Sequence, residues 1–196
     1  MNNHDYRVNL VDDYLKKLNL SNEIKEYYYG RNILVTGGAG AIGSNLVTSL
    51  SKLVGDDGMI IVLDNLSAIK GDEPIDLPPL SNMMFVNGDV RNDIDLKRVF
   101  REKPTIIFHL AAFFANQNSV DYPETSADVD IHGMIKLLDL AQFTGVDKFV
   151  YASSGCAIYG SYGKMPLKED FISMHLTTPY QINKMAGEMY SNFYFH

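Results

Sequence analysis

Beyond residue 30, short apolar runs alternate along the chain with longer segments in which apolar residues recur at helical spacing. Strands are predicted at 32–36, 59–63, 83–87, 105–109 and 148–152, and helices at 41–54, 93–101, 128–143 and 179–193. Four of the strands are nearly uninterrupted apolar runs, which is typical of strands covered on both faces in a parallel sheet. The pattern therefore predicts a doubly wound α/β domain over residues 31–196, with ligands bound beyond the carboxyl ends of the strands.

Residues 1–30 precede this alternation and are predicted to form a helical extension. The apolar residues that recur there at helical spacing are Leu10, Val11, Tyr14, Leu15 and Leu18. Asp12 and Asp13 suit the start of such a helix, and Lys16 and Lys17 suit its end. We expect this helix to pack on the main domain or on a neighbouring subunit, and the tyrosines at 27–29 to be packing residues.

Composition narrows the function classes. The chain has 196 residues, enough for one domain with a real core, and its net charge of −7 disfavours nonspecific binding to nucleic acid or to an anionic membrane. Its single cysteine, Cys156, rules out an intrachain disulfide and fits a reducing compartment. No signal core and no window near the ~18 apolar residues of a membrane helix are present. A cytoplasmic protein without a metal site is expected.

A glycine-rich turn follows the first strand, with the spacing Gly37-x-x-Gly40-x-x-Gly43. Glycines let the backbone approach a pyrophosphate, and the start of the next helix supplies free N–H groups, although such a turn alone also fits a plain connection. Asp64 ends the second strand, 21 residues after Gly43. A carboxylate there accepts hydrogen bonds from both adenosine ribose hydroxyls and repels a 2′-phosphate, which favours NAD over NADP.

Two further strand ends carry candidate residues. Asp89-Val90 follows the third strand, where it lines an adenine pocket or simply caps a turn. His109-Leu110-Ala111-Ala112 ends the fourth strand, and its small residues let the chain pass close to a cofactor. We expect His109 itself to be a packed, hydrogen-bonded core residue rather than a catalytic one.

Tyr180 and Lys184 lie four residues apart, on one face of a predicted helix. An ammonium beside a phenol favours its ionised form, because the positive charge stabilises phenolate. A phenolate can accept a proton from a sugar hydroxyl while hydride leaves the same carbon for a nicotinamide. Any helix can contain this pair by chance, so its meaning depends on the surrounding motifs.

These motifs occur in one order along the chain: Thr36-Gly37-x-x-Gly40-x-x-Gly43, Asp64-Asn65-Leu66-Ser67, Asp89-Val90, His109-Leu110-Ala111-Ala112, Ser153-Ser154 before Tyr159-Gly160, and Tyr180-x-x-x-Lys184. Over residues 31–196 the chain resembles the extended short-chain dehydrogenase/reductase family, specifically its nucleotide-sugar epimerases and dehydratases. Within the family it is most similar to epimerases of bacterial surface-polysaccharide pathways, judged by Asn116-Gln117-Asn118-Ser119 and Gly155-Cys156.

The resemblance implies an NAD site and a catalytic site. The residues it implies at the cofactor are Gly37, Gly40, Ala41, Ile42, Gly43, Asp64, Asn65, Leu66, Ser67, Asp89, Val90, Leu110, Ala111, Ala112, Tyr180 and Lys184. Tyr180 would act as the base, and Lys184 would assist it and hydrogen-bond the nicotinamide ribose.

The chain departs from the family pattern in three places. Gly155 stands where relatives usually carry Ser or Thr, so we nominate Ser154 as the substitute, with Ser153, Cys156 or a water as alternatives. Asp130 replaces an Asn that relatives carry, and a carboxylate can accept but not donate a hydrogen bond. Cys156-Ala157 replaces the Asp-Glu pair of the dehydratases, which argues against dehydration. We expect Cys156 to be a small buried filler and His132 to be structural.

These features together predict an NAD-dependent nucleotide-sugar epimerase that inverts C4 through a 4-keto sugar. The alternatives are a non-catalytic NAD-binding module or fragment, and an oxidoreductase or dehydratase of the same family. The module is favoured by Gly155, by Asp130 and by the early end of the chain, since relatives carry a further C-terminal portion that binds the nucleotide. The resemblance also implies a homodimer formed through the helices at 128–143 and 179–193.

Overall fold

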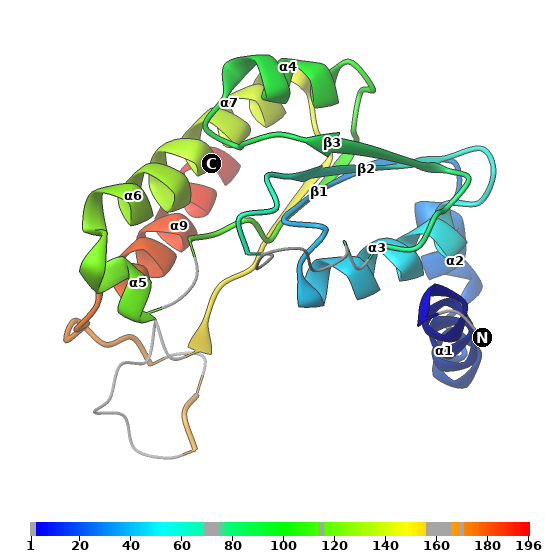
Figure 1. Cartoon of the computed structure of the whole chain (residues 1–196), viewed down its shortest axis with the longest axis horizontal. Coiled ribbons are helices and arrows are strands. Elements are labelled where there is room, and N and C mark those ends of the chain that lie inside the picture. Colours follow the sequence, from blue (N-terminus) through cyan, green and yellow to red (C-terminus); the bar gives the residue numbers. More distant parts are fainter. Residues whose placement is uncertain (1–2, 69–74, 76, 114–115, 156–165, 169–170) are drawn as a thin grey trace.

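Five parallel strands form one sheet at the centre of the molecule (Figure 1). The computed structural model describes residues 3–68, 75, 77–113, 116–155, 166–168 and 171–196. The strands are β1 (Asn32–Thr36), β2 (Met59–Asp64), β3 (Met83–Asn87), β4 (Ile106–His109) and β5 (Lys148–Tyr151), in the order β3-β2-β1-β4-β5. The order reverses beside β1, where the next strands are placed on opposite sides of it, so the predicted doubly wound α/β fold is confirmed.

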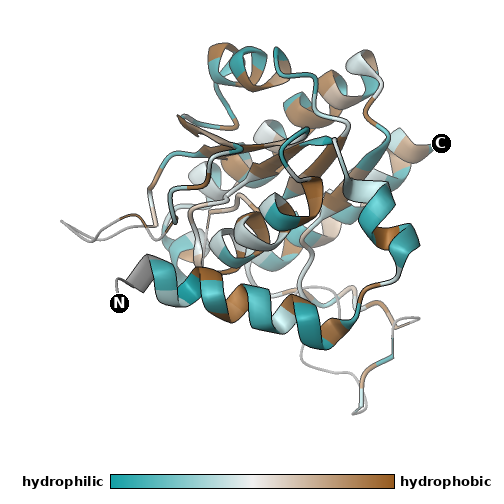
Figure 2. Ribbon diagram, turned by 90° about the vertical axis from the view of Figure 1, so that its right-hand side faces the viewer, coloured by the Kyte–Doolittle hydropathy of each residue, from teal (hydrophilic) through white to brown (hydrophobic). Residues whose placement is uncertain are grey.

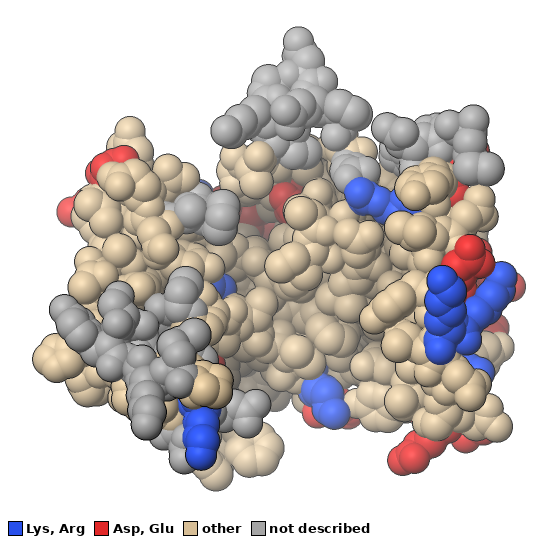
Figure 3. All heavy atoms as spheres, turned by 90° about the horizontal axis from the view of Figure 1, so that it is seen from below, with Lys and Arg blue, Asp and Glu red and all other residues tan. Residues whose placement is uncertain are grey.

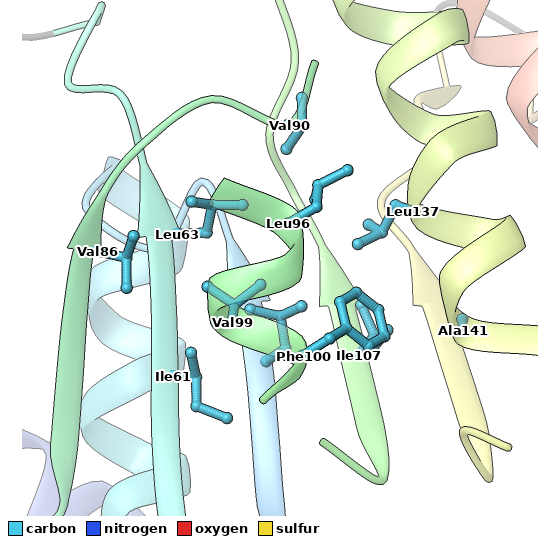
Figure 4. Close-up of a cluster of buried hydrophobic side chains, with 11 residues drawn as sticks. Ile61, Leu63, Val86, Val90, Leu96, Val99, Phe100, Ile107, Leu137 and Ala141 are labelled. Carbon is cyan, nitrogen blue, oxygen red and sulfur yellow. The ribbon is translucent and has the colours of Figure 1, made fainter. Parts of the chain in front are cut away.

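Helices cover both faces of the sheet, and alternate strand residues face each layer. On one face, Ile33 and Val35 pack with Ile60 and Val62 under α3 (Ala41–Val54). On the other, Leu34 and its neighbours pack under α4 (Asp93–Phe100) and α7 (Met134–Thr144). Figure 4 shows this second cluster, in which side chains from β2, β3, β4, α4 and α7 point toward one another. The period of two along each strand and the two buried layers explain why the central strands read as continuous apolar runs.

The edge strand β5 is less covered than its sequence predicted. Phe149-Val150-Tyr151 was expected to be covered on both faces, but the strand alternates between exposed and half-buried residues, and Val150 is 38% exposed. That part of the prediction is wrong because β5 pairs only with β4 within the described residues. Apolar content alone does not separate an edge strand from a central one.

A group of helices lies beside β5: α5 (Asn116–Asp121), α6 (Pro123–Ala127), the π-helical segment η1 (Asp128–Gly133) and α9 (Pro179–Phe195). The sequence predicted one regular helix over 128–143, and the structure has π-helical turns in its first part. The sequence pattern did not predict α5 and α6, which are only six and five residues long. Within the described residues no helix combines the length and the apolarity that crossing a membrane requires.

Two helices precede the sheet: α1 (Asn3–Leu18) and α2 (Asn22–Tyr28), which is capped by Ser21. In Figure 2, α1 crosses the lower front of the molecule and alternates between hydrophilic and hydrophobic residues. It begins earlier than predicted, so Asp12 and Asp13 lie in its interior rather than at its start, while Lys16 and Lys17 do lie in its last turn.

The packing of this N-terminal segment is partial. Of the apolar residues that predicted α1, only Val11 is buried; Leu10, Tyr14 and Leu18 are exposed. The helix is held against α3 by Val11 and by the Lys52–Asp12 ion pair. Tyr27 and Tyr28 pack against the core under α3, as expected. Tyr29 is 59% exposed and its hydroxyl donates to Asp57, so it is not a core packing residue.

Candidate cofactor and catalytic site

The glycine turn after β1 is shaped by two close backbone contacts. Gly37 has a φ of +70°, and a Cβ there would lie 2.6 Å from the backbone nitrogen of Ala111. A Cβ on Gly43 would lie 2.2 Å from the carbonyl oxygen of Gly37. Both positions therefore require glycine for the fold itself: one lets the turn pass the end of β4, and the other lets α3 start directly against the turn.

Gly40 differs from these two glycines, because no contact among the described residues requires glycine there. Its φ is −73°, and a Cβ would meet only the Gly37 carbonyl oxygen, at 3.4 Å, which is ordinary contact. Gly40 is also the N-cap of α3 and has no side chain to bond the free N–H groups of the first turn. The next residues, Ala41 and Ile42, are exposed. The open space and the free N–H groups fit an anionic ligand that approaches the backbone.

Asp64, at the end of β2, ties the glycine turn to the loop that follows. Its carboxylate accepts a hydrogen bond from the Ala39 N–H at 2.9 Å and another from the Leu66 N–H at 2.8 Å. Leu66 has a φ of +59°, an uncommon conformation for a branched residue. Each carboxylate oxygen retains a further lone pair, so the half-buried Asp64 can still accept from ribose hydroxyls. Ser67 is exposed beside it, and its N–H donates to the side chain of Asn65.

Asp89, after β3, is fully engaged by its neighbours. Arg91 donates to it through the guanidinium and the backbone, and Asn65 donates to it at 2.9 Å. The Arg91 hydrogen bonds lower the pKa of Asp89 to about 2. Of the two roles predicted for this residue, the turn cap is the one its contacts describe. Val90 is buried and lies against Gly133, where it leaves no room for a larger residue.

His109 ends β4 as a buried residue, as expected. Its Nδ1 lies 2.6 Å from the Thr36 hydroxyl, while no described residue pairs with its Nε2. Burial, and secondarily the charge of Lys184, lowers the pKa of His109 to about 3, so the ring is neutral at physiological pH. The half-buried residues 110–112 then run along the glycine turn, starting with a bond from the Leu110 N–H to the Thr36 carbonyl.

Tyr180 lies in the first turn of α9, which Thr178 caps by accepting from the Gln181 N–H. The half-buried Tyr180 donates its backbone N–H to the hydroxyl of Ser119, in α5. Ser119 is thus a supporting residue that fixes the start of α9. The sequence signalled it only through the Asn116-Gln117-Asn118-Ser119 segment of the resemblance.

Lys184 lies one turn later and is 3% exposed. Its ammonium donates to the carbonyl oxygen of Ala152 at 2.8 Å, just beyond β5, and lies 5.7 Å from the centre of the Tyr180 ring. Burial lowers the pKa of Lys184, and the negative charge of Asp130 opposes that effect. The pair predicted from the sequence is therefore brought together at the carboxyl end of the sheet.

Asp130, which stands where relatives carry Asn, is buried and bonded to groups of the fold. Its carboxylate accepts from the Phe113 N–H at 2.7 Å, from the Ser126 hydroxyl and from the Asn183 side chain. Burial is the main effect on this group and raises the pKa of Asp130. The contacts join η1, α6 and α9 to the segment after β4, which is a structural role. The partners Ser126 and Asn183 had no sequence signal, because their meeting depends on how three helices pack.

The remaining candidates are less informative. Ser154 is half-buried three residues beyond β5, at the same end of the sheet as Lys184, so its catalytic role stays a prediction. Cys156, Ala157 and the Tyr159-Gly160 pair lie outside the described residues. The side chain of His132 is 68% exposed and pairs with Asp128.

The elements that carry these residues border one hollow. Figure 3 views the molecule from the side toward which β5 points in Figure 1, and shows a hollow between the part carrying α5, α6 and α9 and the central part carrying the start of α3. Among the described residues, no group of three or more His, Cys, Asp or Glu side chains is placed to hold a metal ion. The start of α3 carries first-turn N–H groups that suit an anion, and the Tyr180–Lys184 pair lies on α9, beside the end of β5.

A sheet whose order reverses at a glycine turn, with a Tyr-x-x-x-Lys helix at its carboxyl edge, defines a nucleotide-binding class of α/β proteins. The profile of the NAD dependent epimerase/dehydratase family matches residues 33–194. The chain belongs to that family.

Three relatives show how the chain compares with characterised members. It is 38% identical to a UDP-glucose 4-epimerase of Mycolicibacterium smegmatis, over 82% of this chain and 50% of that protein. An epimerase structure from Methanothermobacter thermautotrophicus aligns with a TM-score of 0.81 and 48% identity, over 88% of this chain and 49% of that one. The structure of the Thermotoga maritima UDP-glucose 4-epimerase with UDP-glucose aligns with a TM-score of 0.73 and 39% identity, over 83% of this chain and 50% of that one. The chain spans about half the length of these relatives.

Proposed function

We propose that the protein is an NAD-dependent nucleotide-sugar epimerase that inverts C4 of its substrate through a 4-keto sugar. The observation that carries the proposal is the placement of the buried Lys184 ammonium, between the end of β5 and the ring of Tyr180. Two of the matched relatives are named UDP-glucose 4-epimerases, which supports the same reaction class and a nucleotide-diphosphate sugar as substrate.

The residues of the glycine turn fit an NAD diphosphate. Among the described residues, a Cβ at Gly40 would meet only the Gly37 carbonyl oxygen, and α3, which starts there, has no side-chain cap for its first-turn N–H groups. Asp64 keeps acceptor capacity for the ribose hydroxyls and disfavours a 2′-phosphate. When bound, NAD supplies a hydride acceptor that can also return the hydride.

The chain's own groups supply the proton transfer. Tyr180, as phenolate, accepts the proton of the sugar hydroxyl, and Lys184 favours that ionised form by its charge. Ser154 or a water takes the hydrogen-bonding role of the hydroxyl that Gly155 lacks. Nothing in this scheme requires Asp130 to touch the cofactor.

The test is turnover by the purified protein. With NAD added, at least one UDP-, GDP- or dTDP-hexose is expected to convert to its C4 epimer, followed by NMR of the sugar products. If every hexose tested is returned unchanged by a folded protein that binds NAD, the epimerase proposal fails.

A non-catalytic NAD-binding module is the second candidate. It is favoured by the absence of a side chain at Gly155 and by the bonds that occupy Asp130 within the fold. Calorimetry separates the two: NAD binding together with UDP-sugar binding favours the epimerase, and NAD binding without UDP-sugar binding favours the module.

A homodimer is proposed through α7 and α9. Both helices present large exposed apolar side chains, including Phe143 at 89% and Phe193 at 70% exposure, which supports a covered surface in an assembly. Size-exclusion chromatography coupled to light scattering tests this proposal. A protein that is only monomeric at high concentration would contradict it. The cytoplasmic location and the link to surface polysaccharides stay predictions.

A further inference from the structure

The Lys184 ammonium lies between two aromatic rings. Its Nζ is 4.8 Å from the centre of the Tyr151 ring and 5.7 Å from that of Tyr180. The spacing in the sequence pairs Lys184 with Tyr180 alone. Tyr151 comes from the end of β5, and the sequence predicts it only as a strand residue.

Burial makes the charge of this ammonium costly. Lys184 is 3% exposed, and among the described residues it forms no ion pair within 4 Å. One of its three N–H groups donates to the Ala152 carbonyl oxygen. Asp130 stabilises the charge from η1, but its carboxylate is occupied by neutral donors. The face of an aromatic ring attracts a cation within about 6 Å, and more strongly where water is excluded.

The Tyr151 ring is held between β4 and α9. It stacks on the neutral ring of His109, whose centre lies 5.9 Å away on β4. On the α9 side, a Cβ at Gly187 would lie 2.3 Å from the Tyr151 hydroxyl oxygen, so the helix approaches the ring as closely as a glycine allows. The hydroxyl itself is buried and no described residue pairs with it. The phenol group therefore contributes its ring, not a hydrogen bond.

We propose that Tyr151 is a positioning residue for the Tyr180–Lys184 pair, whose ring holds the buried Lys184 ammonium at the end of β5 and keeps it charged. The groups that face the ammonium are Tyr151 from β5, His109 from β4, Asp130 from η1 and Tyr180 from α9, and Glu188, also on α9, acts on Tyr151. His109 is neutral, and Asp130 is the carboxylate whose negative charge acts on the ammonium. The proposal deepens the proposed function, since the role it gives Lys184 is the one stated above.

The test is a direct titration of Lys184 by NMR in the whole chain labelled with ¹³C at lysine Cε. The Lys184 signal is assigned by its loss in Lys184→Arg. Tyr151→Leu removes the ring, and its titration midpoint is expected to fall by about one pH unit. Tyr151→Phe keeps the ring and is expected to titrate as the wild type does. Phe149→Leu makes a comparable aromatic deletion two residues earlier on β5 and serves as the matched control.

An unchanged or raised midpoint in Tyr151→Leu, or an equal shift in Phe149→Leu, would overturn the proposal. If the leucine variant does not fold, Tyr151→Met replaces it, since methionine fills a similar volume without a ring. The same fall in the Lys184 titration midpoint is then expected, and an unchanged or raised midpoint would again overturn the proposal. The titration needs neither NAD nor turnover. A failure here therefore leaves the proposed reaction intact, and a failure of turnover leaves this result intact.

Discussion

At the glycine turn the close contacts are between backbone groups, whereas at the end of β5 they are between charged and aromatic side chains. Gly37 and Gly43 let the turn, the end of β4 and the start of α3 meet at backbone distance. Lys184 instead sits against Tyr151, Tyr180 and a carbonyl supplied by Ala152. The glycines of the first region lie close together in sequence and form a short motif, and the second region exists only after β5, η1 and α9 have packed together.

Replacing the phenol tests the second region most strongly. In Tyr180→Phe, turnover is expected to fall by about 10²–10⁴-fold, because no group remains to accept the hydroxyl proton. Steady-state kinetics with the converted hexose measures the loss. Tyr194→Phe, on the same helix, removes a hydroxyl that bonds Asp139 outside the site and should retain turnover. Equal activity in the two variants would contradict the role of Tyr180.

Adding one methyl group tests the first region. Gly43→Ala places a Cβ 2.2 Å from the Gly37 carbonyl oxygen, with backbone on both sides. The strain is expected to lower the free energy of unfolding by about 3 kcal/mol, measured by urea denaturation. Gly40→Ala, three residues earlier, has space for its Cβ and should unfold like the wild type. Equal losses in both variants would show that the steric account of the turn is wrong.

The pH dependence of stability should distinguish the buried His109. The pKa of His109 is about 3 in the folded protein, against a reference value of 6.5 for the unfolded chain. Between these values the unfolded chain binds a proton that the folded protein does not, so the free energy of unfolding falls as the pH falls below 6.5. Between about pH 4.5 and 6.5, wild type is expected to lose about 1 kcal/mol per pH unit more than His109→Asn.

Urea titrations of both proteins across that range give this difference. The raised pKa of Asp130 acts in the opposite direction but is common to both curves, so it cancels. Parallel curves would mean that His109 is protonated in the folded protein.

The smallest effect is expected from the Tyr151 hydroxyl. It is buried with no described partner, so Tyr151→Phe should raise the free energy of unfolding by about 1 kcal/mol. Thermal and urea unfolding of the two proteins measure it. A destabilised Phe variant would show that the hydroxyl has a partner in solution.

The same contrast explains what the sequence could predict. The five strands, the glycine turn and the Tyr180–Lys184 spacing follow from local periodicity and short motifs, and the structure has them close to the predicted bounds. The α1 start was misplaced because its apolar face is mostly exposed, so the periodicity did not report packing. The Asp130–Asn183 contact and the ring of Tyr151 beside Lys184 could not be predicted, since each depends on how separate elements pack.

The central claim is that a dinucleotide diphosphate occupies the space left open at Gly40. Calorimetric titration with NAD tests it in three proteins. The wild type should bind, and Gly40→Ala should bind at least about tenfold more weakly with an unchanged unfolding midpoint. Gly145→Ala, at a left-handed position at the end of α7, should lose stability but bind NAD normally. Wild-type affinity in Gly40→Ala, or no binding by the folded wild type, would contradict the account.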